Sequence, residues 1–249
     1  MRLTMTDVAN MIDISAVRAD VSDTEIRELA EKARKYRCAC AFVMPCYVPD
    51  VRAYLDGEPA IGVGSVVGFP SGADTTMAKA YQARQLAAEG CCELDMVINV
   101  GMLISERYSE VKNDIRAVID SSEGLPVKVI LEVAYLTDDQ IRKGCDICID
   151  AGASFVKTGT GWARKGTTVD HIKLIKSHVG DRIKIKASGG IRSLDTIIKM
   201  NRSGATRFGI GVRSVTSIMQ ECRSIDSGAA DLDGNAVWER GGCDRRAVR

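Results

Sequence analysis

Eight short apolar segments recur along the chain, and each is followed by residues with the periodicity of a helix. The segments are near-continuously apolar and rich in β-branched residues, as expected for parallel strands covered on both faces. They span residues 9–15, 38–44, 61–69, 93–100, 127–133, 154–158, 182–188 and 206–212. Eight strand–helix units in 249 residues predict an α/β fold, a single-domain (β/α)8 TIM barrel.

Signals at the helix starts agree with this fold. Ser22 and Thr137 each begin a capping-box pattern ahead of an apolar periodic run, which is typical of a helix N-terminus. A doubly wound sheet is the alternative, but its first strand is usually followed by a glycine-rich phosphate turn, which "MIDISAV" does not offer. We expect residues 1–223 to form the barrel. Residues 224–249 lose periodicity and gain glycine and charge, so we expect a mobile C-terminal tail there.

The composition restricts the class of partner and the compartment. A net charge of +1 gives no electrostatic case for nucleic acid or an anionic membrane. No apolar run approaches the ~18 residues of a membrane helix, and the first residues lack the apolar core of a signal peptide. Nine cysteines, an odd number without a secretion signal, indicate reduced thiols. We therefore expect a cytoplasmic protein; a homo-oligomer is compatible with the sequence, which does not define the oligomeric state.

Histidine is scarce, and this shortage limits the possible chemistry. His171 and His178 are the two histidines of the chain, too few for a multi-histidine metal site and poor material for a Ser-His-Asp triad. Cys145 and Cys148 form one CxxC inside a helical pattern without a second pair at zinc spacing, so we interpret them as core thiols. The sequence predicts no metal and no cofactor.

Polar residues fall where several predicted strands end. The carboxyl ends of barrel strands form the active face, and Asp13, Asp95, Glu132, Lys157 and Lys186 lie there. Strands six and seven are neighbours, so we expect the two lysines to lie side by side. Desolvation and a second cation both disfavour protonation of an amine. One lysine can then be neutral at pH 7 and act as a nucleophile toward a carbonyl, which makes a small-molecule carbonyl compound the expected partner.

Asp95 lies in an otherwise apolar strand, "ELDMVIN", and a buried carboxylate needs a cationic partner. Lys186 is the candidate. Such a pair can relay protons directly or through water. A structural ion pair inside the barrel is the alternative interpretation, as is a Lys157 that reaches back to solvent.

A glycine pair, Gly189 and Gly190, follows predicted strand seven. Barrel enzymes often bind phosphate at the loops after strands seven and eight, through backbone N–H groups and a helix N-terminus. Arg192 adds charge beside these glycines. The predicted substrate-binding residues are Asp13, Thr158, Thr160, Gly161, Gly189, Gly190, Arg192, Gly209, Gly211 and Arg213.

Six motifs resemble those of deoxyribose-phosphate aldolases in order and spacing. They are "VMPCYVPDV", "VVGFPSGADTT", "ELDMVINVGML", "VKVILEVAYLTDDQI", "AGASFVKTGTGW" and "IKASGGIR". The resemblance covers roughly residues 8–215. It implies a class I, metal-free aldolase on a (β/α)8 barrel that reversibly cleaves 2-deoxy-D-ribose 5-phosphate to D-glyceraldehyde 3-phosphate and acetaldehyde in deoxynucleoside catabolism. It also implies that Lys157 forms the Schiff base, Lys186 lowers its pKa, Asp95 relays protons and Asp13 contacts the substrate.

The chain departs from this family at its phosphate site. The family has serines after strand eight that help to hold the phosphate, where this chain has Gly211 and Val212 followed by Arg213. Two expectations stay open: Arg213 has taken over the phosphate, or the aldolase uses the same mechanism on another phosphosugar or an unphosphorylated acceptor. A non-catalytic sugar-phosphate binder is a further alternative, and the retained Lys157, Lys186 and Asp95 speak against it.

Overall fold

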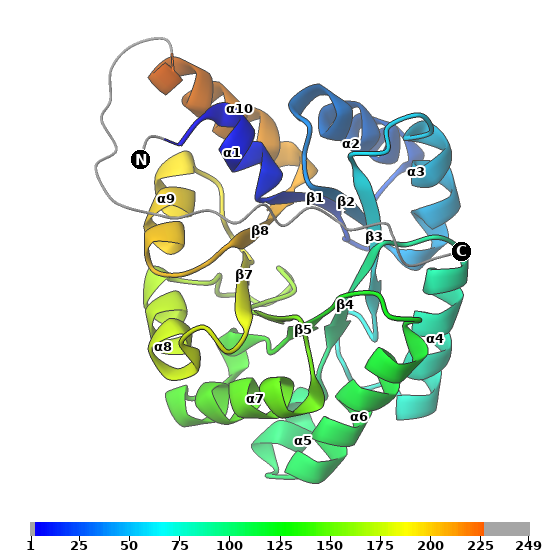
Figure 1. Ribbon diagram of the computed structural model, residues 1–249, viewed down its shortest axis with the longest axis vertical. Coiled ribbons are helices and arrows are strands. Elements are labelled where there is room, and N and C mark those ends of the chain that lie inside the picture. Colours follow the sequence, from blue (N-terminus) through cyan, green and yellow to red (C-terminus); the bar gives the residue numbers. More distant parts are fainter. Residues whose placement is uncertain (1–2, 227–249) are drawn as a thin grey trace.

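The computed structural model describes residues 3–226. Eight parallel strands pair in chain order and close into one barrel, with helices packed around it (Figure 1). The (β/α)8 prediction is therefore confirmed, and the doubly wound alternative is wrong. The strands are β1 (Ile12–Ala16), β2 (Cys40–Val43), β3 (Gly62–Val67), β4 (Glu93–Val97), β5 (Val127–Ile130), β6 (Phe155–Lys157), β7 (Lys184–Ser188) and β8 (Arg207–Gly211).

The helices follow the strands and cover the outside of the barrel. They are α1 (Met5–Asn10), α2 (Asp23–Tyr36), α3 (Val48–Tyr54), α4 (Thr76–Ala88), α5 (Val100–Ile104), α6 (Tyr108–Ser121), α7 (Asp138–Ala151), α8 (Val169–Val179), α9 (Leu194–Arg202) and α10 (Val212–Asp226), with 3-10 turns η1 (Pro45–Tyr47) and η2 (Val133–Tyr135). Helix α1 lies beside α10, so the first and last described elements pack together (Figure 1). The predicted tail over 224–249 begins too early, because α10 runs to Asp226; its remainder, 227–249, lies outside the described residues.

One predicted capping box forms completely and the other by half. Thr137 caps α7 by accepting from the Gln140 N–H, and the Gln140 side-chain oxygen accepts from the Thr137 N–H. Ser22 caps α2 by accepting from the backbone N–H of Glu25. The carboxylate of Glu25 instead binds Arg18, with 2.6 Å between Nη2 and Oε2. A charge-assisted bidentate pair with arginine outweighs the return bond to a backbone amide.

The apolar core fills the space between strands and helices, and the barrel interior is polar. Ile12 and Ile14 of β1 belong to the core cluster, whereas the intervening Asp13 is fully buried in an ion-pair cluster. Alternation along each strand separates the two environments, because successive side chains point to opposite faces. The site is therefore built inside a rigid ring of strands. No helix between residues 3 and 226 combines the length and the apolar character that a bilayer crossing requires.

Candidate active site

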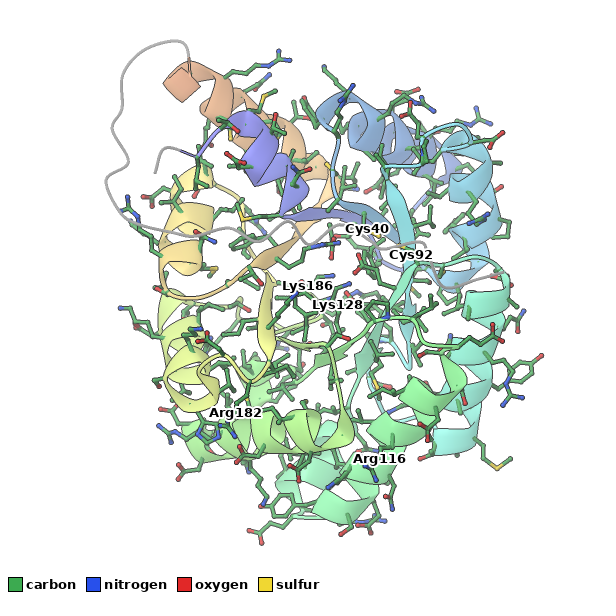
Figure 2. The ribbon with its side chains drawn as sticks, viewed as in Figure 1. Cys40, Cys92, Arg116, Lys128, Arg182 and Lys186 are labelled. Atoms are coloured by element: carbon green, nitrogen blue, oxygen red, sulfur yellow. The ribbon has the colours of Figure 1, made fainter. Side chains whose placement is uncertain are left out.

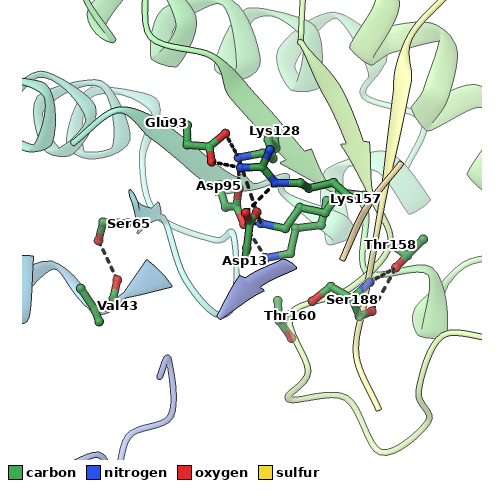
Figure 3. A network of polar contacts seen from close by, with 12 residues as sticks. Asp13, Val43, Ser65, Glu93, Asp95, Lys128, Lys157, Thr158, Thr160 and Ser188 are labelled. Atoms are coloured by element: carbon green, nitrogen blue, oxygen red, sulfur yellow. Dashed lines mark hydrogen bonds and ion pairs between the residues drawn. The ribbon is translucent and has the colours of Figure 1, made fainter. Parts of the chain in front are cut away.

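Lys157 and Lys186 lie side by side, as predicted. Strands β6 and β7 pair in a register that sets Lys157 opposite Lys186. Both ammonium groups donate to one oxygen, Asp95 Oδ2, at 2.7 Å from Lys157 Nζ and 2.6 Å from Lys186 Nζ. The prediction that Lys186 is the partner of Asp95 is confirmed, and Asp95 bridges the two lysines. Figure 3 shows Asp95 beside Lys157.

This triad is part of a larger group, here called the charged cluster. Its members are Asp13, Glu93, Asp95, Lys128, Lys157, Lys186 and Arg207. All but Arg207 are buried, and that residue is 12% exposed in its side chain. Lys128 and Lys186 lie near the centre of the ring of strands in a view down the barrel (Figure 2).

The charged cluster is a continuous chain of ion pairs. Arg207 bridges two carboxylates, with Nε 2.6 Å from Asp13 Oδ1 and Nη2 2.5 Å from Glu93 Oε1. Lys128 Nζ lies 2.5 Å from Glu93 Oε2, and Lys186 Nζ lies 2.5 Å from Asp13 Oδ2. Removal of Lys128, Lys186 or Arg207 would leave a carboxylate partner buried and less compensated.

The charge balance of the cluster bears directly on Lys157. The cluster contains four cationic residues and three carboxylates. When Lys157 is protonated, one positive charge is in excess; when Lys157 is neutral, the cluster is balanced. In a buried site of low dielectric constant, an uncompensated charge is costly. The cluster as a whole therefore favours a neutral amine.

The pKa of Lys157 reflects this environment. Burial lowers it, the attraction of Asp95 opposes the change, and the repulsion of Lys186 and Lys128 lowers it further, to about 8. At pH 7 roughly a tenth of Lys157 is then neutral, compared with well under a thousandth at the usual lysine pKa of ~10.4. A neutral amine is the form that attacks carbonyl groups.

The two aspartates stay ionised. Burial alone would raise the pKa of Asp95, but Lys157, Lys186 and Lys128 outweigh it and hold this pKa below its usual range. At Asp13, burial also raises the pKa, but the attraction of Arg207, Lys186 and Lys128 outweighs burial. The pKa of Asp13 is therefore lowered as well. Asp13 Oδ2 and Asp95 Oδ1 nevertheless accept no well-directed hydrogen bond from the described residues. These two oxygens can accept a hydrogen bond from a substrate hydroxyl or a water molecule.

A small cavity opens beside the lysines, here called the reaction cavity. Its volume is about 20 Å³, enough for about one water molecule. The lining residues are Asp13, Ser15, Val17, Phe42, Val66, Asp95, Lys157, Thr160, Lys186, Ser188 and Gly209. Gly209 is needed here, because a Cβ at this position would lie 2.7 Å from Ser188 Oγ. Asp13, Thr160 and Gly209 were predicted as substrate-binding residues, and the structure brings them to this cavity.

A second, larger cavity lies between the loops after β5, β6 and β7, here called the loop cavity. It measures about 160 Å³. Of the predicted substrate-binding residues it is lined by Gly161, Gly189, Gly190 and Arg192. Its other polar or charged lining residues are Glu132, Arg164, Lys165, Thr167 and Ser188.

Three predicted binding residues line neither cavity. The Arg213 guanidinium lies 3.4 Å from Glu25 Oε2, with its side chain 70% exposed, and its neighbour Gly211 is also exposed. Thr158 is fully buried: its hydroxyl donates to the Ser188 carbonyl and accepts from the Ser188 N–H. Arg213 turns to α2 and Thr158 joins β6 to β7, and the assignment of these three residues to substrate binding stays a prediction.

The sequence reasoning missed Glu93, Lys128, Arg207 and Ser188. A signal for the first two was present, since Glu93 lies two residues before Asp95 and Lys128 lies between apolar residues of β5. Positions i and i+2 of a strand share one face, so an inward Asp95 implies an inward Glu93. Ser188 carried the same signal, because it lies two residues after Lys186 in β7. Arg207 lacks it, because its contacts with Asp13 and Glu93 depend on strand register.

One group among residues 3–226 has the spacing of a metal site. Ligand atoms of Cys40, Cys92 and Glu93 lie within 4.8 Å of one another. This group sits at the amino ends of β2 and β4, whereas Lys157 is the last residue of β6. Cys40 and Cys92 are labelled in Figure 2. Both Glu93 oxygens already contact Lys128 and Arg207, and these cations oppose a metal ion.

A closed barrel that buries a lysine of lowered pKa beside a second lysine and a shared aspartate has the chemistry of an imine-forming enzyme of the aldolase class. The family model of DeoC/LacD family aldolases matches residues 6–220, and the chain belongs to this family. It is therefore a carbon–carbon lyase.

Two relatives and one solved structure illustrate the similarity. The deoxyribose-phosphate aldolase of Rhizobium meliloti (strain 1021) is 44% identical over 230 residues, 92% of this chain and 93% of the relative. The one of Carboxydothermus hydrogenoformans is 42% identical over 86% of this chain and 95% of the relative. The deoxyribose phosphate aldolase structure from Aeropyrum pernix, described as tetrameric, has a TM-score of 0.80 at 27% identity and covers 89% of this chain and 93% of that one.

Proposed function

We propose that this protein reversibly cleaves 2-deoxy-D-ribose 5-phosphate to D-glyceraldehyde 3-phosphate and acetaldehyde through a Schiff base on Lys157. The observation that carries the proposal is the buried Lys157 ammonium, whose pKa is lowered to about 8 beside Lys186 and Asp95. Relatives with this activity in their names span nearly the whole chain, so an aldolase with another acceptor is not favoured. A non-catalytic binder would have no use for a lysine held in this state.

The chemistry follows from a neutral amine at Lys157. Its Nζ attacks the C1 aldehyde carbon of the open-chain sugar, water leaves, and a protonated imine forms. The C2–C3 bond then breaks, its electron pair moves into the imine to give an enamine, and the C3 hydroxyl loses its proton to a base. The C3 fragment leaves as glyceraldehyde 3-phosphate. Protonation of the enamine carbon and hydrolysis release acetaldehyde and restore Lys157.

Asp95 and Lys186 support the proton transfers. The Asp95 Oδ2 atom accepts from both ammonium groups, so a proton can move between Lys186, a water molecule and the substrate without a large change in geometry. Because the Asp95 pKa is held low, this carboxylate acts mainly by holding the two ammonium groups. Asp13 is fixed by Arg207 and Lys186 and presents Oδ2 to a substrate hydroxyl.

The phosphate end belongs at the loop cavity. Gly189 and Gly190 both have positive φ, 102° and 79°, a backbone shape that turns successive N–H groups toward an anion. Arg164, Lys165 and Arg192 line the same cavity and supply positive charge there. Arg213, held at Glu25, has no part in this proposal.

Compartment and assembly are part of the proposal. Cys38, Cys145 and Cys148 are buried free thiols, which fits a reducing compartment such as the cytoplasm. The Aeropyrum pernix relative is described as tetrameric, and we infer that this chain also forms a homo-oligomer.

Borohydride trapping tests the central step. Reduction in the presence of acetaldehyde should add one ethyl group to the peptide that contains Lys157, because the imine becomes a stable secondary amine. Mass spectrometry of the digested protein locates the label. An unlabelled Lys157, or a label on another lysine, would remove it from the mechanism. Turnover of 2-deoxyribose 5-phosphate should not change with EDTA, since we assign no step to a metal ion.

A further inference from the structure

Three loops of the carboxyl face meet at one side chain, Trp162. Its indole N–H donates to the backbone carbonyl of Val17, with 2.9 Å between Nε1 and O. Its ring meets Phe69 edge-on, with centroids 6.0 Å apart and planes at 86°. Val17 follows β1, Phe69 follows β3 and Trp162 follows β6. These contacts join distant parts of the chain.

The order of the strands determines where this side chain lies. In the closed barrel, β6 is separated from β1 by β7 and β8, and from β3 by β4 and β5. A side chain that starts after β6 and contacts the loops after both β1 and β3 has to cross the mouth of the barrel. Lys157 is the last residue of β6, so the indole lies over the end of the barrel where the nucleophile is.

The backbone beneath Trp162 is tied to the reaction cavity. The Trp162 N–H donates to Thr160 Oγ1 at 3.0 Å, and the Thr160 hydroxyl donates to the buried carboxylate of Glu132. Thr160 and Val17 both line the reaction cavity. Trp162 is therefore attached to the cavity wall twice. Its backbone N–H is bonded to Thr160, and its indole is bonded to the carbonyl of Val17.

The indole is nevertheless weakly held. Trp162 is 44% exposed, and its side chain has one neutral hydrogen bond and one aromatic edge contact among the described residues. The reaction cavity beneath has a volume of about 20 Å³, too small for the carbon chain of a sugar. Substrate entry therefore requires a rearrangement at the mouth, and the half-exposed Trp162 side chain, held by these two contacts, can take part in it.

We propose that Trp162, which lies over the mouth of the reaction cavity and outside its lining, is the roof of this cavity and determines specificity for the aldehyde end of the substrate. This inference rests on the proposed function. Once the mouth has opened around an imine on Lys157, an indole at this place leaves less space for a longer alkyl group than for the two-carbon donor. The roof also keeps bulk water away from the imine and enamine. The phosphorylated fragment extends in the other direction, toward the glycines after β7.

Donor selectivity tests the roof. In the synthetic direction, with glyceraldehyde 3-phosphate as acceptor, kcat/KM is measured for acetaldehyde and for propanal. We expect Trp162→Ala to raise the propanal-to-acetaldehyde ratio about tenfold or more, the lower end of the discrimination that a pocket achieves for one methylene. Trp162→Phe keeps a ring but loses the bond to Val17, so its ratio should lie between those of Trp162→Ala and the wild type.

The control is Tyr135→Ala. Tyr135 is an aromatic residue in η2 after β5, 61% exposed. Unlike Trp162, its side chain makes no hydrogen bond or ring contact with the loops after β1 and β3 among the described residues. Its removal should leave the ratio unchanged. If the propanal-to-acetaldehyde ratio is unchanged in Trp162→Ala and Trp162→Phe while acetaldehyde is still turned over, Trp162 is not the roof of the reaction cavity. The same conclusion follows if Tyr135→Ala changes this ratio as much as Trp162→Ala does.

Fluorescence provides a readout that does not depend on turnover. Trp162 and Trp238 are the two tryptophans of the chain, so Trp238→Phe leaves Trp162 as the sole reporter. Acetaldehyde should change the emission of this variant, because the indole packs over the imine. An emission that stays constant while borohydride labels Lys157 would contradict the roof and leave the proposed function standing. Absence of any label on Lys157 would instead contradict the proposed function.

Discussion

Lys157 combines two demands that a single lysine rarely meets, burial and reactivity. Burial lowers its pKa, yet Asp95 lies 2.7 Å from Nζ and opposes that change. With Asp95 alone the lysine would be held as a cation in an ion pair. Lys186 contacts the same carboxylate oxygen at 2.6 Å and competes for it. The reactivity of Lys157 therefore comes from an aspartate that is shared between cations.

Substitution of Lys186 should reveal this competition. In Lys186→Met we expect the pKa of Lys157 to rise above about 8, because a repelling cation is lost and Asp95 attracts Lys157 alone. Turnover at pH 7 should fall by roughly tenfold for each pKa unit regained, and the rise of kcat/KM with pH should move to higher pH. Lys184→Met is the matched control, since Lys184 is an exposed lysine of the same strand. A pH profile that stays in place in Lys186→Met would show that Lys186 does not set this pKa.

At the level of elements, the strands were predictable and the directions of several side chains were not. Seven of the eight strands fall within segments that near-continuous apolar patterns predict, and β1 extends one residue beyond its segment, to Ala16. The pattern is visible because parallel strands are covered on both faces. The short helices α1, α3 and α5 were not predicted, since five to seven residues give too few turns for a period to be visible. The positions of Lys157 and Lys186 in the barrel could be predicted from strand order alone. The position of the Arg213 side chain could not be predicted in this way, because its contact with Glu25 depends on how α10 packs against α2.

The loops after β6 and β7 should account for phosphate recognition. We expect Arg192→Ala to raise KM for 2-deoxyribose 5-phosphate by roughly ten- to hundredfold, the value of one hydrogen bond to a charged group. Turnover of unphosphorylated 2-deoxyribose should change little. Arg213→Ala is the comparison, and its effect should be small because Arg213 binds Glu25. The opposite pattern, with Arg213 essential and Arg192 dispensable, would place the phosphate beyond β8.

At the level of the whole molecule, the barrel encloses charge where a core of branched aliphatic side chains is usual. The charged cluster costs stability, because ionised groups lose hydration that their mutual attraction replaces only in part. The apolar layer between strands and helices compensates for this. Such a division of roles is common in enzymes, in which the active site is less stable than the scaffold that supports it.

We therefore expect Lys157 to lower the free energy of unfolding of the protein by a measurable amount. Its pKa is lowered to about 8 in the folded state, compared with ~10.4 in an unfolded chain. The folded state binds this proton more weakly, so the destabilisation is fully present below pH 8 and disappears as pH rises toward 10.4. At pH 7 it amounts to ~2–3 kcal/mol.

Lys157→Met removes the titrating group, and its Tm at pH 7 should exceed that of the wild type by roughly 5–10 °C while activity is lost. The gap between the two Tm values should narrow at pH 9.5. A Lys157→Met protein that is less stable than the wild type at pH 7 would mean that the bond to Asp95 outweighs burial and repulsion, and that the lysine is not strained toward its neutral form.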